Sequence, residues 1–214
     1  MSKTLVTLGD SWPAGGELDF ARGEVPYGNL LQYRMGFDSL HNYGSGGASN
    51  EDMLYQLQRF IAESHVPGNQ VTAIFFLTNP ARTAHFPRFF SWESNTDSKQ
   101  KELYMHFHRR EHEAMRSSAT VSALQAWCSN LGFNDYYFSG WVRYPTWLPG
   151  VDTGKIWAQG NETVADWFGA SKHNGEHLLD VGDNIYIHPN FAHPNQLGHE
   201  LIADRLISWI SQAR

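Results

Sequence analysis

Apolar segments of strand length alternate along this chain with segments of helical periodicity. Four segments are predicted to be buried strands, at residues 4–8, 39–43, 71–78 and 133–142. The third of them reads VTAIFFLT, and a run with so few polar positions is typical of a strand covered on both faces. The pattern therefore predicts a central sheet with 71–78 in its interior.

Three other segments repeat apolar residues at spacings of three and four, as helices do. The first starts near residue 50, with Ser49 or Asn50 as its N-cap. The second covers about 99–131 and stops at Gly132, and the third covers about 195–212. Strands that alternate with helices predict an α/β fold of three layers, α/β/α, around a mostly parallel sheet. Sites in such folds gather at the carboxyl ends of the strands.

The chain has the length and composition of one globular domain. Its 214 residues are 41% hydrophobic and 18% charged, so the sequence is too apolar for disorder, and we expect a single domain over 1–214. Residues 80–95 and 144–167 lack clean periodicity and are expected to be loop insertions rich in aromatic residues. Two explanations stay open for their aromatic side chains: packing beneath long loops, or a wall that binds a sugar or an acyl group. The tryptophans concerned are Trp92, Trp147, Trp157 and Trp167, with Trp141 at the edge.

Charge and cysteine content narrow the class of partner. The formal net charge of -6 disfavours nucleic acid and anionic membrane surfaces, which leaves a small molecule or a neutral partner. The single cysteine, Cys128, excludes an intrachain disulfide and suits a reducing compartment. No run approaches the length of a membrane span, and the first predicted strand starts too early to leave room for a signal peptide, so we expect a cytoplasmic protein unless an unseen export route acts.

Four short motifs carry candidate chemistry. Gly9-Asp10-Ser11 follows the first strand, and a serine at this point can expose both its hydroxyl and its N–H above the sheet. Gly44 to Asn50 follows the second strand and contains glycines whose N–H groups can point outward. Thr78-Asn79-Pro80 follows the third strand and offers a carboxamide, and His193-Pro194 precedes the last helix, where the histidine is a candidate base.

Taken together and in this order, the four motifs resemble the SGNH (GDSL-like) hydrolase family. The resemblance implies a flavodoxin-like α/β/α fold in which Ser11 is the nucleophile and His193 the base. It also implies an oxyanion hole formed by the N–H groups of Ser11 and Gly47 with the Asn79 amide. The implied activity is hydrolysis of esters through an acyl-enzyme without a cofactor, on a small ester or on O-acyl (for example acetyl) groups of a carbohydrate. The oligomeric state is not implied.

The sequence departs from the family pattern in two places. Leu77 stands where the third block normally has glycine, and Pro80 replaces its usual aspartate. The family's catalytic acid lies three residues before the histidine, and that position is Asn190 here. Either Asp183 or Asp180 reaches the imidazole instead, or Asn190 orients it, or a backbone carbonyl completes a Ser-His dyad, or the activity has been lost. A catalytically inactive protein of the same fold that binds carbohydrate or takes part in an assembly is therefore the alternative function.

Three further features are candidate site elements. Trp12 and Arg82 are weak candidates for substrate binding, and Arg82 could instead hold the loop after the third strand. His108, Glu111 and His112 match the H-x-x-E-H pattern of some zinc peptidases, with Glu162 or Glu176 available as a further ligand. The charged residues around this motif favour a solvated helix face, so a zinc peptidase is the third choice and no metal is expected.

Overall fold

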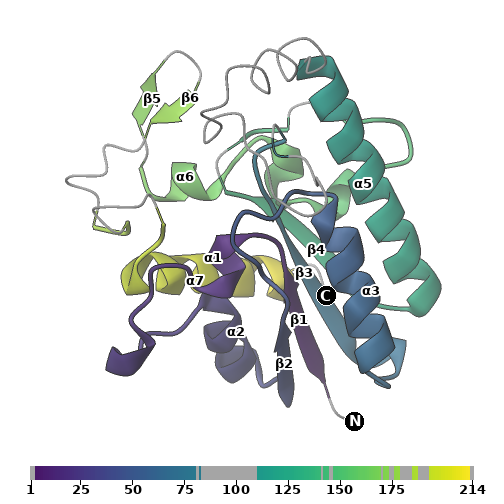
Figure 1. The fold of residues 1–214 in the computed structure, drawn as a ribbon, viewed down its shortest axis with the longest axis horizontal. Helices are drawn as coiled ribbons and strands as arrows, with labels where there is room; N and C mark the ends of the chain where they lie inside the picture. Colours follow the sequence, from purple (N-terminus) through teal and green to yellow (C-terminus); the bar gives the residue numbers. More distant parts are fainter. Residues whose placement is uncertain are drawn as a thin grey trace, which may run out of the picture.

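The computed structural model describes residues 3–80, 82, 110–140, 142–144, 147–169, 171–173, 176–178, 185–187 and 193–212, with backbone alone at 110–111, 171–173 and 176–178. Its strands and helices alternate as the sequence predicts (Figure 1). They are β1 (Thr4–Leu8), α1 (Ser11–Ala14), η1 (Phe20–Arg22), α2 (Tyr27–Met35), β2 (Ser39–Asn42), α3 (Asp52–Glu63), η2 (Gly68–Gln70), β3 (Val71–Leu77), α5 (Arg110–Leu131), β4 (Asn134–Ser139), η4 (Thr153–Lys155), η5 (Trp157–Gly160), α6 (Val164–Trp167), β5 (Ser171–His173), β6 (Glu176–Leu178) and α7 (Gln196–Gln212).

The central sheet is parallel, with strand order β2-β1-β3-β4. Its strands lie within the four predicted segments, and β3 is buried at all seven of its positions, as a strand covered on both faces must be. The chain starts at β1, moves outward to β2, and then returns across β1 to β3. Between β1 and β3 the order of the strands reverses, and in open α/β sheets this reversal opens the crevice in which ligands bind.

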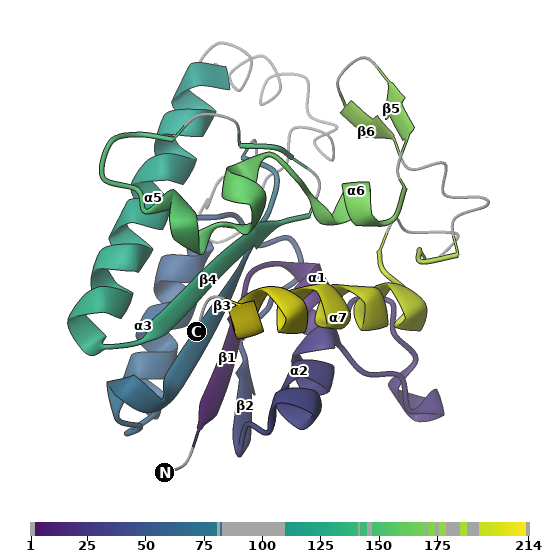
Figure 2. The same cartoon turned by 180° about the vertical axis from the view of Figure 1, so that it is seen from behind.

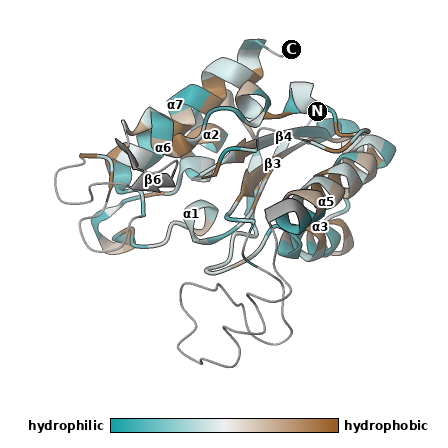
Figure 3. Ribbon diagram, turned by 90° about the horizontal axis from the view of Figure 1, so that it is seen from above, coloured by the Kyte–Doolittle hydropathy of each residue, from teal (hydrophilic) through white to brown (hydrophobic). Residues whose placement is uncertain are grey.

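Helices cover both faces of the sheet, which confirms the three-layer prediction. Seen from behind and from above, α2 and α7 lie on one face and α3 and α5 on the other, with β3 between the two layers (Figures 2 and 3). Alternate positions of the strands supply two buried clusters: Leu5, Ile74 and Phe76 pack toward α2 and α7, whereas Val6 and Phe75 pack toward α3 and α5. Because the strands of the central sheet are parallel, their carboxyl ends lie at one edge of the sheet, above which α1 and α6 lie (Figure 1).

The predicted helices lie where the sequence places them, but their observed ends differ from the predicted ends. Helix α3 starts at Asp52 with Glu51 as its N-cap, so the predicted caps were wrong: Ser49 instead binds the Asp52 carboxylate through its N–H and its hydroxyl. Helix α5 runs to Leu131 before Gly132, whose φ of 74° ends it as predicted, while residues 99–109 lie outside the described residues. Helix α2 has no counterpart among the predicted elements.

The two aromatic segments have different outcomes. Residues 83–95 lie outside the described residues. In the other segment, Trp157 packs edge-to-face against Trp167 and Trp209, and Trp167 is only 8% exposed. Trp147 stacks on Tyr144. These contacts favour packing over a sugar-binding wall for the described part of 144–167.

No helix among the described ranges is long and apolar enough to cross a membrane.

Candidate active site

Ser11 stands at the carboxyl end of β1, beside the point where the strand order reverses. Gly9 makes the turn with φ of 137°, and a Cβ there would lie 2.8 Å from both Cβ and the carbonyl oxygen of Phe76, so only glycine fits. Asp10 is the N-cap of α1 and accepts the N–H of Trp12 at 3.0 Å. Ser11 therefore occupies the first position of a helix, where its own N–H has no partner within the helix.

His193 meets Ser11 from the other end of the chain. Ser11 Oγ lies 2.8 Å from His193 Nε2, a hydrogen bond in which the imidazole can accept the hydroxyl proton. The loop before α7 is fixed by Asn195, whose side chain accepts the N–H of Gly198 and donates to the carbonyl of Ile185. Gly16 leaves room for the ring, because a Cβ there would lie 3.3 Å from His193 Cδ2.

The second ring nitrogen of His193, Nδ1, is the atom for which the sequence offers several alternative partners. Nδ1 is buried and has no hydrogen-bond partner among the described residues. Asn190, Asp183 and Asp180 all lie outside the described residues. Which of them orients His193, if any, therefore stays a prediction.

The loop after β2 lies directly against the Ser11 loop. The N–H of Ser45 donates to the carbonyl of Gly9 at 3.1 Å, and Asn42 Nδ2 donates to the carbonyl of Pro13 at 2.6 Å. Gly44 allows this approach, because a Cβ there would lie 2.5 Å from the backbone nitrogen of Ala14. Gly47 is exposed with φ of 78°, and no described group accepts its N–H. An outward N–H in this loop has the character that an oxyanion donor requires.

The residues after β3 form the third side of the site. Asn79 directly follows the buried Thr78, and its carbonyl accepts the N–H of Arg82 at 3.0 Å. The Arg82 guanidinium donates to Asp10 Oδ2 at 2.7 Å and to Thr78 Oγ1 at 2.8 Å. Asp10 is 2% exposed, and its ion pair with Arg82 compensates for the burial of the carboxylate. Of the two roles considered for Arg82, the structure thus favours the one that holds the loop.

The indole of Trp12 and the described part of the H-x-x-E-H motif lie away from the Ser11–His193 pair. Trp12 is 2% exposed and packs on Phe76 and Phe168, so its indole belongs to the core beneath Ser11; a direct contact with substrate was the wrong expectation. His112 is exposed on α5, the side chain of Glu111 is not described, and His108 lies outside the described residues. No group of three metal-binding side chains is found in the part of the chain that the structure describes.

The sequence did not predict the buried polar side chains that hold the Ser11 loop and the loop after β3 in place. Gln56, on the buried face of α3, accepts the N–H of Gly9 at 2.8 Å and donates to its carbonyl at 2.9 Å. Asn50, taken for a helix cap, is bonded to Thr78 and Tyr144. A buried polar residue on an otherwise apolar helix face was the available signal for Gln56, because such a side chain must find partners.

A buried histidine on α7, His199, lies near His193. His199 Nδ1 accepts the N–H of Tyr27 at 3.2 Å, at the start of α2, and its ring stacks on that tyrosine. Burial, and to a lesser degree the neighbouring His193, lowers the pKa of His199 to about 3. His199 is thus a neutral imidazole that accepts a bond from the helix.

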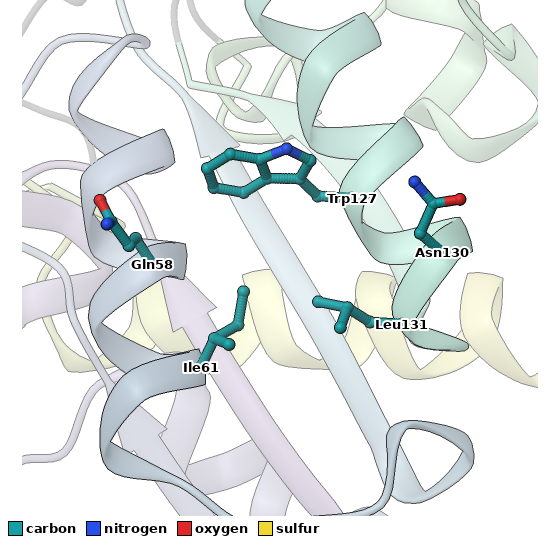
Figure 4. A pocket seen from close by; sticks show the side chains of 5 residues that line it. All are labelled: Gln58, Ile61, Trp127, Asn130 and Leu131. Atoms are coloured by element: carbon teal, nitrogen blue, oxygen red, sulfur yellow. The ribbon is translucent and has the colours of Figure 1, made fainter.

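A separate hollow of about 280 Å³ lies between α3 and α5 (Figure 4). Trp127 and Leu131 of α5 face Ile61 of α3 across it, with Gln58 and Asn130 at its margin. Neither Ser11 nor His193 lines this hollow.

Comparisons with known proteins show the same architecture. No protein-family model matches the sequence, and no curated protein does. Among solved structures, TesA superposes with a TM-score of 0.56 at 14% identity over 97% of this chain and 98% of its own. The esterase EstA from Pseudoalteromonas sp. gives 0.53 at 15% identity, covering 99% and 98%. A protein assigned to the lipolytic G-D-S-L family from Desulfitobacterium hafniense gives 0.51 at 11% identity, covering 97% and 99%.

The chain has the SGNH (GDSL-like) hydrolase fold. The TM-scores of 0.51–0.56 show the shared fold, whereas the identities of 11–15% leave the activity to be argued from the site. Within the SGNH fold, Ser11 and His193 stand together and the Gly44–Asn50 loop lies against the Ser11 loop. Asn79 directly follows Thr78, whose hydroxyl is bonded to Asp10 of the Ser11 loop.

Proposed function

We propose that this protein is a serine ester hydrolase that works through an acyl-enzyme. The single observation that supports this most is the 2.8 Å hydrogen bond between Ser11 Oγ and His193 Nε2 at the carboxyl edge of the sheet. A hydroxyl becomes a useful nucleophile only with a base in hydrogen-bond contact, and here the base comes from a distant loop. EstA, a solved structure with the same fold, is an esterase by name, which adds support.

In the proposed acylation step, Ser11 Oγ attacks the ester carbonyl as its proton passes to His193 Nε2. The new C–O bond gives a tetrahedral intermediate whose oxygen carries a negative charge. We propose that the N–H groups of Ser11 and Gly47 and the Asn79 amide donate to that oxygen. The protonated His193 then gives its proton to the departing alcohol as the ester C–O bond breaks.

Deacylation repeats these transfers with water. His193 accepts a proton from a water molecule as the water oxygen attacks the acyl carbon. Collapse of the second tetrahedral intermediate breaks the bond to Ser11 Oγ, and the proton on His193 returns to Ser11. The products are a carboxylic acid and the regenerated hydroxyl, so the cycle balances without a cofactor.

We propose a small O-acyl ester as the substrate and do not restrict its alcohol to a sugar. A sugar ester remains within the proposal because 83–95, the other segment expected to supply a sugar-binding aromatic wall, lies outside the described residues. The aromatic residues of 144–167 give it less support, because Trp157 and Trp167 pack into the core.

The test is hydrolysis of short p-nitrophenyl esters by the wild type, by Ser11→Ala, and by Ser45→Ala as a matched control. Ser45 is an exposed serine on the neighbouring loop, and only its backbone bonds to Gly9. We expect Ser11→Ala to lose turnover and Ser45→Ala to keep it. Turnover that survives in Ser11→Ala, or that disappears with a chelator and returns with zinc, would contradict the proposal and favour the His108-Glu111-His112 motif. A wild type without turnover that still binds carbohydrate would favour the binding protein.

A further inference from the structure

One buried threonine, Thr78, connects three loops of the proposed site: the Ser11 loop, the Gly44–Asn50 loop and the loop after β3. Thr78 is 3% exposed and follows the last residue of β3, directly before Asn79. Its hydroxyl reaches the loop of Ser11, and its backbone reaches the loop of Gly47. Thr78 therefore occupies the position from which the relative placement of all three loops can be set.

The hydroxyl of Thr78 makes the connection to the nucleophile. It donates to Asp10 Oδ2 at 2.8 Å and accepts a hydrogen bond from Arg82 Nη1 at 2.8 Å. Arg82 Nη1 also donates to the same Asp10 oxygen, so the three groups form a closed triangle. Asp10 precedes Ser11 and caps its helix, so a shift of the carboxylate would shift Ser11.

The backbone of Thr78 makes the connection to the glycine loop. Its N–H donates to Asn50 Oδ1 at 2.9 Å, and its carbonyl accepts the hydroxyl of Tyr144 at 2.5 Å. Asn50 Nδ2 donates to the same hydroxyl at 3.0 Å and to Ser117 at 3.2 Å. Asn50 stands three residues after Gly47 and is 2% exposed, so its partners are fixed by the core.

We infer that Thr78 is a positioning residue for the oxyanion hole, and that its hydroxyl sets the distance between Ser11 and the Asn79 loop. The inference rests on the proposed function. Donors to an oxyanion act only when they are held in place before charge develops, so an error in their spacing lowers the rate of the chemical step. Binding of the ground-state ester depends less on that spacing.

The test separates the hydroxyl of Thr78 from its volume. Thr78→Val keeps the shape and removes the hydroxyl, whereas Thr78→Ser keeps the hydroxyl and removes a methyl. We expect Thr78→Val to lower kcat about tenfold, with KM changed less than about twofold, and Thr78→Ser to stay near the wild type. Thr72→Val, at a buried position of β3, the strand that Thr78 follows, is the matched control and should leave kcat unchanged.

The opposite ranking, with Thr78→Val active and Thr78→Ser impaired, would show that Thr78 only fills space and would overturn the inference. A wild type without Ser11-dependent turnover would refute the proposed function itself, and this is seen before any Thr78 variant is measured. If Thr78→Val does not fold, Arg82→Gln decides, because Arg82 is 29% exposed and closes the same triangle. We expect a severalfold fall in kcat relative to Arg22→Gln, a control at an exposed, ion-paired arginine, and an unchanged kcat would overturn the inference.

Discussion

Ser11 Oγ lies 2.8 Å from Nε2 of His193, although 182 positions separate the two residues in the chain. The contact forms because β1 and the loop before α7 end at the same edge of a parallel sheet, where the strand order reverses. The loop after β2 and the residues after β3 contact the Ser11 loop there, and they carry Gly47 and Asn79, which the proposed reaction uses.

Asn79 is predicted to act in the transition state. Removal of one oxyanion donor costs about 10² to 10³ in kcat, and we expect Asn79→Ala to fall in this range with KM little altered. Steady-state kinetics on a short p-nitrophenyl ester measures both constants, and Asn69→Ala, at an exposed position in η2, is the control. An unchanged kcat would mean that the departures at Leu77 and Pro80 have removed this role.

The partner of His193 Nδ1 is predicted to be the uncharged Asn190, one of the aspartates Asp183 and Asp180, or a backbone carbonyl. If it is Asn190, Asn190→Asp should raise kcat/KM and move the acidic limb of the pH profile upward, because an added carboxylate favours the imidazolium. If Asp183 or Asp180 already serves, Asn190→Asp will be neutral or harmful, and Asp183→Asn or Asp180→Asn will be the damaging change. The pH dependence of kcat/KM for the three variants decides between them, and no effect in any of them would point to a backbone partner.

Because of His199, the free energy of unfolding is predicted to decrease as the pH falls. Its pKa is lowered to about 3 in the fold, below the usual value of about 6.5 for an unfolded chain, so the folded state binds fewer protons. Its contribution is fully present above about pH 6.5 and is lost as the pH falls toward 3, by about 1.4 kcal/mol per pH unit.

Urea unfolding between about pH 4.5 and about pH 7 measures this slope. His199→Gln should flatten it relative to the wild type, whereas His112→Gln, at an exposed histidine, should not. Equal slopes in all three proteins would show that His199 is not kept neutral by the fold.

Gly44 is predicted to tolerate no side chain, because it lies where the loop after β2 contacts the Ser11 loop. A Cβ at Gly44 would lie 2.5 Å from Ala14 N and 3.0 Å from the Asp10 carbonyl, both backbone atoms, so the loops would have to separate. We expect Gly44→Ala to lower the free energy of unfolding by about 1–3 kcal/mol and to reduce turnover. A Cβ at Gly46 meets nothing within 4 Å, so Gly46→Ala should be stable to within about 0.5 kcal/mol. Equal melting temperatures for the two variants would refute this packing argument.

The sequence predicted those parts of the fold that depend on local pattern. The apolar runs located the four strands of the central sheet, most clearly β1 and β3, because a strand buried on both faces has few polar positions. Short motifs at strand ends predicted which loops would meet, since parallel strands bring their carboxyl ends to one edge. Helix α2 was missed because Tyr27, Gly28 and Leu31 bury a narrow stripe among polar neighbours.

Contacts between distant residues could not be read from local pattern. Asn50 resembles a helix cap in sequence, and only the approach of β3 turns its amide toward Thr78. Trp12 looked like a substrate contact because of its neighbour Ser11, yet the helix turn directs its ring toward Phe76 and Phe168. In each case the tertiary environment, and not the residue type, decides the role.

The most direct measurement for the whole account is the mass of the protein, and of its peptides, after treatment with a fluorophosphonate. This reagent transfers a phosphonyl group to an activated serine with loss of fluoride, and the bond between Ser11 and His193 is the feature that would activate one. We predict one adduct per chain, on the peptide that contains Ser11, and no adduct in Ser11→Ala or after replacement of His193 by alanine. An unmodified wild type, or an adduct that persists in Ser11→Ala, would contradict the account.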